Sequence, residues 1–114
     1  GLKDLKKVAL YLSDRQKNRQ KKKGGLNGHE LREELGDRPV LNACVLDYLL
    51  DYPELIPSEW KDKLVFFWGT IYRHWDGVLF VRCLSWDRHG WVWHYDALGN
   101  NFYSYALAAV SASV

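Results

Sequence analysis

The chain of 114 residues is 47% hydrophobic and 26% charged, which is typical of a single globular domain. Its two cysteines are too few for a disulfide framework, its formal net charge of +2 is far below that of a dedicated nucleic-acid-binding domain, and no apolar run approaches the ~20 residues of a membrane helix. The unusual feature is the aromatic content of 15%, with six tryptophans as the main excess.

The first 52 residues carry helical patterns. Five apolar residues recur at helical spacing near the start: Leu2, Leu5, Val8, Ala9 and Leu12. They predict an amphipathic helix from about residue 2 to the low twenties, ended by the glycine pair at 24–25. Asn27 is expected to cap a short second helix that runs to Leu35, and Asp37 to cap a third that ends before Pro53.

After a connector at 53–61, with a single helical turn expected at 58–60, the apolar period changes to that of strands. Three strands and a short fourth are predicted, over 64–73, 78–86, 91–95 and 102–105. Hairpin turns are expected at 76–77 and 87–90, each with a glycine that can adopt a positive φ. The tail from Ala106 is expected to form a terminal helix turn or a frayed end.

These elements predict a single α+β domain over residues 1–114. Two or three helices at 1–52 precede an antiparallel β-meander of three to four strands at 62–106, which holds most of the aromatic residues. Helices first and strands after is the order of the α+β class, because α/β proteins alternate the two.

A register for the meander follows if Trp86 pairs with Trp91 and residues 75–77 form the first turn. The pairs that result are Tyr72 with Phe80, Phe66 with Trp86, Trp68 with Leu84, Trp93 with Leu84, Tyr95 with Arg82, and Cys83 with His94. Most large rings then lie on one face of the sheet and aliphatic side chains on the other. Two or three helices cover one apolar face well, so the other is expected to meet a ligand, a second subunit, or the connector and tail of the same chain.

Two groups of residues are candidate binding features. The aromatic face supplies Trp68, Tyr72, Arg82, Trp86, Trp91, Trp93 and Tyr95. The run RQKNRQKKK supplies a basic arm of Arg15, Lys17, Arg19, Lys21, Lys22 and Lys23. Protein–protein interfaces favour Trp, Tyr and Arg. Proteins that bind single-stranded nucleic acids stack the bases on aromatic rings and contact the phosphates with Lys and Arg. A basic run is also typical of a solvated helix end.

The favoured function is a small non-enzymatic interaction module that self-associates as a dimer. The alternative is single-stranded nucleic-acid binding through the aromatic face and the basic arm. A third hypothesis is a thiol enzyme in which His94 activates Cys83, although a buried structural cysteine explains the same pair. Neither cofactor nor metal is expected, because the cysteines and histidines lack metal-ligand spacing. Two thiols without a visible signal peptide indicate the cytoplasm.

The last two thirds of the chain carry a specific pattern. It consists of Ile56, Pro57, Glu59, Trp60 and Lys61, then the run Phe66–Ile71, then Val81, Arg82, Leu84 and Trp86, and a final Trp-x-Trp at 91–93. From Leu41 onward the chain resembles a family of small uncharacterised proteins predicted from bacterial genomes. The resemblance implies a bacterial protein and brings no activity, substrate or site. The basic arm lies outside the resembling part.

Overall fold

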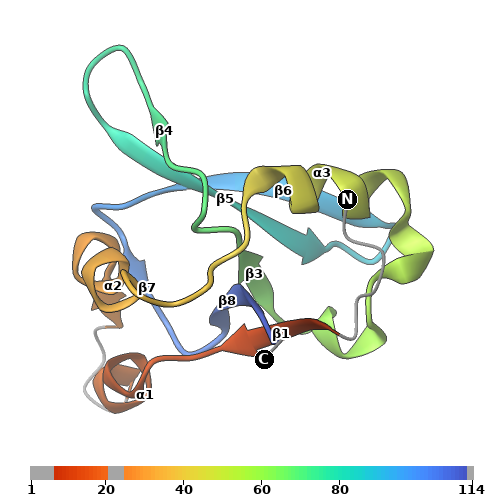
Figure 1. Ribbon diagram of the computed structural model, residues 1–114, viewed down its shortest axis with the longest axis horizontal. Coiled ribbons are helices and arrows are strands. Elements are labelled where there is room, and N and C mark those ends of the chain that lie inside the picture. Colours follow the sequence, from red (N-terminus) through yellow and green to blue (C-terminus); the bar gives the residue numbers. More distant parts are fainter. Residues whose placement is uncertain (1–6, 21–24, 113–114) are drawn as a thin grey trace.

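The computed structural model describes residues 7–20 and 25–112. In chain order the elements are β1 (Val8–Tyr11), α1 (Asp14–Gln20), β2 (Leu26–Asn27), α2 (Gly28–Glu34), α3 (Ala43–Asp51), the 3-10 helices η2 (Pro53–Leu55) and η3 (Ser58–Trp60), β3 (Leu64–Phe66), β4 (Tyr72–Arg73), β5 (Leu79–Trp86), β6 (Trp91–Ala97), β7 (Asn101–Phe102) and β8 (Ala106–Ser111) (Figure 1). The fold is α+β as predicted, with more strands than predicted. No helix in the described part of the chain is long and apolar enough to cross a membrane.

Six strands form the main sheet, in the order β1-β8-β3-β5, with β4 and β6 also paired to β5. The pairing is antiparallel except between β3 and β8, which run parallel. β2 and β7 form a separate two-stranded sheet. The fourth strand of the meander was predicted over 102–105. The structure instead has the two-residue strand β7 at Asn101–Phe102, and it belongs to this small sheet.

Both faces of the main sheet are packed against other parts of the chain. On one face, the core cluster contains Leu26, Leu31, Leu35, Phe66, Trp68, Val81, Cys83, Leu98, Phe102, Ala106 and Ala108. On the other, α3 and the 3-10 helices contribute to a cluster of Leu46, Leu49, Ile56, Trp60, Val65, Phe67, Leu84 and Ala109. The chain's own elements thus cover much of both faces. In Figure 1, α2 lies at the left of the molecule and α3 at the upper right.

The first predicted helix is wrong in its N-terminal half. Residues 8–11 form β1, which pairs antiparallel with β8, while residues 1–6 lie outside the described residues. The helix begins only after Ser13, whose Oγ accepts from Gln16 N at 3.1 Å while Gln16 Oε1 accepts from Ser13 N at 3.2 Å. This reciprocal capping box is a local signal for the true helix start.

The second helix is confirmed, with Asn27 Oδ1 accepting from His29 N at 2.9 Å. The third begins later than predicted, because Asn42 and not Asp37 supplies the cap. Val40, expected inside that helix, instead bridges to Val110 of β8. The predicted helical turn at 58–60 is confirmed as η3.

The C-terminal tail was predicted wrongly. Residues 106–111 form β8, which lies between β1 and β3 in the main sheet. Its small side chains fit there because large side chains from neighbouring strands fill both core clusters. Of the two hairpin turns, the first has its positive φ at Gly77 as expected, whereas in the second Arg88 and not Gly90 adopts the positive φ.

The strand predicted over 64–73 is interrupted, and this changes the faces of two aromatic residues. Tyr72 pairs with Phe80, and an uninterrupted strand in that register would pair Val65 with Asp87. Val65 instead pairs with Leu84, so the register shifts by three residues between β4 and β3. This shift of three residues is an odd number, and an odd shift moves side chains to the opposite face. Phe66 therefore pairs with Cys83 instead of Trp86, and Trp68 does not oppose Leu84.

Candidate interaction surface

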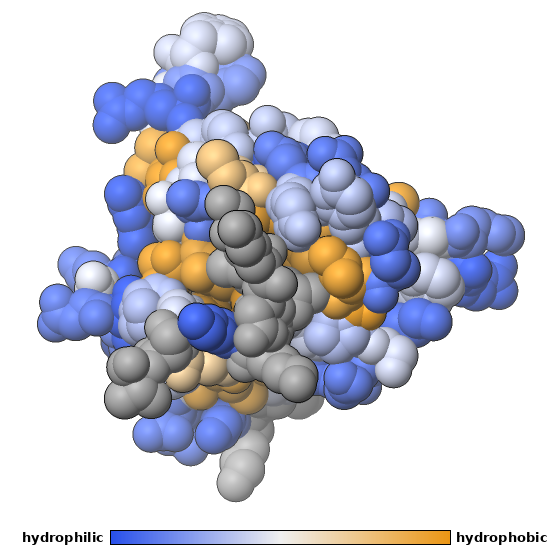
Figure 2. All heavy atoms as spheres, turned by 45° about the vertical axis from the view of Figure 1, so that its right-hand side comes forward, coloured by the Kyte–Doolittle hydropathy of each residue, from blue (hydrophilic) through white to orange (hydrophobic). Residues whose placement is uncertain are grey.

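A group of exposed and half-buried rings lies on β4, β5, β6 and the hairpin that joins β4 to β5. Its members, called here the aromatic surface, are Tyr72, His74, Trp75, Phe80, Trp93 and Tyr95. Trp75 is 90% exposed at the tip of the β4–β5 hairpin, and Tyr95 and Trp93 are 51% and 41% exposed. On the face shown in Figure 2, this hairpin tip stands out at the top, and hydrophobic side chains lie in several groups between hydrophilic ones.

Cross-strand pairing holds these rings in a fixed arrangement. The predicted pairs of Tyr72 with Phe80, Arg82 with Tyr95, Leu84 with Trp93 and Trp86 with Trp91 are all confirmed. Tyr95 is the central ring: its centroid lies 5.5 Å from that of Tyr72, 5.9 Å from Phe80 and 4.9 Å from Trp93, each in edge-to-face geometry. Such contacts stabilise aromatic pairs by about 0.5–1.5 kcal/mol beyond their area burial. The surface is therefore preorganised.

Arg82 lies beneath these rings and joins them to α3. Its guanidinium carbon is 4.1 Å from the centroid of the Trp93 ring, and its Nη2 donates to Asp47 Oδ1 at 3.0 Å. A longer contact of 3.4 Å runs from Nη1 to the Tyr72 hydroxyl. Burial by itself would lower the pKa of Arg82, but the hydrogen bonds to Tyr72 and Asp47 outweigh it and raise the pKa. Arg82 is thus a permanent cation that orients the rings.

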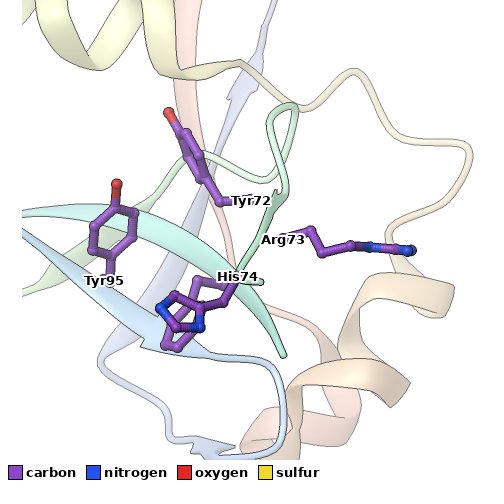
Figure 3. A pocket seen from close by; sticks show the side chains of 5 residues that line it. Tyr72, Arg73, His74 and Tyr95 are labelled. Carbon is purple, nitrogen blue, oxygen red and sulfur yellow. The ribbon is translucent and has the colours of Figure 1, made fainter. Parts of the chain in front are cut away.

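The rings surround a shallow pocket of about 270 Å³, lined by Tyr72, Arg73, His74, Phe80 and Tyr95. In Figure 3 the hydroxyl groups of Tyr72 and Tyr95 point the same way, whereas Arg73 points away from both rings. The volume is just under the ~300 Å³ at which ordinary small-molecule sites begin. The hollow therefore fits a single side chain or ring from a partner better than a whole drug-sized ligand.

The structure divides the aromatic residues predicted to bind. Tyr72, Arg82, Trp93 and Tyr95 come together in one place. Trp86 and Trp91 form a half-buried pair, with centroids 5.3 Å apart, at the far end of the β5–β6 hairpin. Placing Trp68 on this surface was wrong: it is 5% exposed and packs in the other core cluster.

Two members of the aromatic surface, His74 and Trp75, were missed by sequence reasoning. Phe80 was correctly placed opposite Tyr72 but was not named among the binding residues. Trp75 directly precedes Asp76-Gly77, the turn that the sequence itself marks. A tryptophan beside a tight turn has few neighbours to bury it, and this was the available signal. Asp47 carried no such signal, because only the packing of α3 on the sheet brings it to Arg82.

The basic arm does not join the aromatic surface in the described structure. Arg15 forms ion pairs with Glu30 and, at 3.9 Å, with Glu34 of α2, and Lys17 lies 3.8 Å from Asp14. The side chain of Arg19 and the whole of Lys21, Lys22 and Lys23 lie outside the described residues. α1 itself is at the opposite end of the molecule from the β4–β5 hairpin (Figure 1).

Cys83 lies opposite His94 in the strand register, as predicted, but its chemistry does not suit a nucleophile. Burial raises the pKa of the Cys83 thiol from its ordinary value of 9.0 to about 12. His94 Nε2 lies 3.1 Å from Ser85 Oγ. The thiol is therefore protonated at neutral pH. Within residues 7–20 and 25–112, no cluster of three or more His, Cys, Asp or Glu could hold a metal ion.

Thiol reactivity checks this picture. We expect iodoacetamide at pH 8 to alkylate the exposed Cys44 and to leave Cys83 unmodified until the protein unfolds. Because the folded pKa of Cys83 is the higher one, its contribution to stability is intact below about pH 9 and is lost as the pH rises towards 12. Mass spectrometry of the labelled native protein should show one adduct, and two adducts would contradict the burial.

Comparison of the chain with protein-family models, with curated proteins and with solved structures finds no match.

Proposed function

We propose that this protein is a small non-enzymatic interaction module that self-associates through the aromatic surface. One observation carries the proposal: Trp75, Trp93 and Tyr95 are exposed although the same chain buries Trp60, Trp68 and three phenylalanines in its cores. Interface hot spots are enriched in Trp, Tyr and Arg. The aromatic surface presents the first two over a buried arginine.

The rigidity of the rings supports a binding role. Binding costs conformational entropy for each side chain that must be ordered, about 0.5–1.5 kcal/mol for flexible ones. Here Tyr95 is already held by Tyr72, Phe80 and Trp93, so little of that cost remains. The surface can therefore gain affinity from burying its rings, which is a salt-insensitive contribution.

Nucleic-acid binding is less well supported by the described geometry. That function needs cations beside the stacking rings. Arg82 is 8% exposed and already bound to Asp47, and Arg15 is paired with α2. Arg73 is exposed and lines the pocket, but its side chain points away from the Tyr72 and Tyr95 rings (Figure 3). The rings and the basic arm thus do not form one continuous surface within the described residues.

Sedimentation equilibrium at about 1–200 μM protein tests the proposal. We expect a concentration-dependent dimer that persists at high salt, because apolar contacts are not screened. Tyr95→Ala should weaken the dimer about tenfold or more, the range of an interface hot spot. Tyr105→Ala is the matched control, since Tyr105 is 49% exposed against 51% for Tyr95 but lies outside the aromatic surface.

Two outcomes would contradict this function. One is a monomer at every concentration and salt. The other is quenching of tryptophan fluorescence by mixed-sequence single-stranded RNA or DNA at about 50 mM salt that fades at about 200 mM, as a multi-phosphate contact requires. The second result would favour the nucleic-acid alternative.

A further inference from the structure

β6 is a long strand at one edge of the main sheet. Its backbone hydrogen bonds to β5 alternate along the strand, as in any antiparallel pair. Leu98 N donates to Leu79 O and Asp87 N donates to Gly90 O, which fixes the phase at the two ends of the β5–β6 ladder. Between these ends Val92, His94 and Asp96 are the residues that bond to β5. The N–H and C=O groups of Trp91, Trp93, Tyr95 and Ala97 therefore point outward from the edge.

The edge formed by β6 lacks proline, lysine and bulges, three of the features that often prevent strand addition. Proteins protect edge strands with proline, lysine, bulges or covering elements. The seven residues of β6 include neither proline nor lysine, and their pairing with β5 is continuous from Trp91 to Ala97. Among the described residues, β5 is the one strand that pairs with β6. The Ala97 carbonyl already accepts from Asn100 N, so the free groups concentrate around Trp93 and Tyr95.

We propose that β6 pairs antiparallel with β6 of a second copy of this chain, about a two-fold axis at His94. This rests on the proposed self-association and specifies its geometry. The outward groups of Trp93 would exchange two hydrogen bonds with those of Tyr95 in the second copy, and the two-fold axis repeats the exchange. The two sheets then form one continuous sheet across the dimer.

The side chains of β6 are self-complementary in this register. On one face, each Trp93 lies opposite Tyr95 of the second copy, which joins the two aromatic surfaces through cross-strand ring pairs. On the other face, Val92 lies opposite Asp96 and His94 opposite its own copy, so no two carboxylates face each other. Residue 94 is the midpoint of Trp91–Ala97, and a shift of two residues would leave one end of each strand unpaired.

A second copy is the occupant that these features favour. An isologous contact places the same strand on both sides of the axis. β6 supplies both partners of the ring pair that the contact needs, Trp93 and Tyr95, whose centroids already lie 4.9 Å apart within one strand. A foreign strand would have to supply the same alternation of rings and outward backbone groups independently.

Disulfide cross-linking tests the register directly. In the proposed dimer, His94 faces itself and Val92 faces Asp96 as non-hydrogen-bonded pairs, whose Cα separation of about 4.5 Å suits a disulfide. In a background that lacks both native thiols, Cys44→Ser with Cys83→Ala, we expect His94→Cys to form a covalent dimer on mild oxidation; Cys83 is removed because it lies opposite residue 94 in the same chain. Val92→Cys mixed with Asp96→Cys should also cross-link, whereas Val92→Cys alone should give about tenfold less covalent dimer because its copies lie four residues out of register.

The controls separate this inference from the proposed function. Sedimentation of the uncross-linked protein establishes whether a dimer exists, and circular dichroism of each variant establishes that it folds. A dimer in sedimentation together with cross-linking of both the His94→Cys protein and the mixed pair supports the β6 contact. A dimer that cross-links in neither experiment overturns the β6 contact and leaves self-association intact. A monomer throughout overturns both.

Discussion

Phe66→Ala should lower the free energy of unfolding by about 4 kcal/mol, the range for truncating a fully buried aromatic side chain. Phe66 lies in β3 between Cys83 of β5 and Ala108 of β8, and is almost completely buried. Its ring meets that of Phe102 edge-to-face with centroids 4.9 Å apart. Removing it leaves a cavity at the point where the main sheet meets the small β2–β7 sheet.

Urea unfolding followed by tryptophan fluorescence measures this loss. Trp75→Ala is the control, because a side chain that is 90% exposed should change stability by less than about 0.5 kcal/mol. The contrast is informative because both residues are aromatic and lie only nine positions apart in the sequence. A loss below about 2 kcal/mol for Phe66→Ala would mean that this cluster is loosely packed.

Sequence periodicity alone predicts part of the aromatic surface and fails at Phe66. Alternation along 78–86 and 91–95 placed Arg82, Trp93 and Tyr95 correctly, and the first hairpin turn placed Tyr72 opposite Phe80, because both hairpin turns are marked locally by Asp and Gly. The same reasoning carried the register through to Phe66 and failed there. The three-residue shift between β4 and β3 accommodates the approach of Gly69 to the backbone of Leu41 and Asn42, which are distant in sequence.

The remaining errors also come from long-range contacts. The segment 8–11 has apolar residues that suit a helix or a strand, and only pairing with β8 decides between them. The tail at 106–111 has weak strand preference by itself, and β1 and β3 stabilise it from both sides. In contrast, the caps at Asn27 and at Ser13–Gln16 are local, so the sequence contains their full signal.

Gly28→Ala should destabilise the fold by about 3 kcal/mol, the upper range for overpacking. Alanine near the start of an exposed helix would ordinarily stabilise it by up to about 1 kcal/mol relative to glycine. Here the added Cβ would lie 2.5 Å from the carbonyl oxygen of Leu98 and 2.6 Å from a ring carbon of Phe102. The first of these contacts is with backbone, so it cannot be relieved by a side-chain rotation alone.

Gly99→Ala is the matched control, because it lies in the adjacent turn and its added Cβ would meet nothing within 4 Å. Thermal unfolding of both variants should show a large drop in Tm for Gly28→Ala and little change for Gly99→Ala. The clash also reaches the proposed contact between two copies, since Leu98 directly follows β6 and bonds to Leu79. A displaced Leu98 would shift the end of β6, so Gly28→Ala should weaken the dimer as well as the fold. Unchanged stability in Gly28→Ala would show that the turn at 97–100 moves freely away from α2.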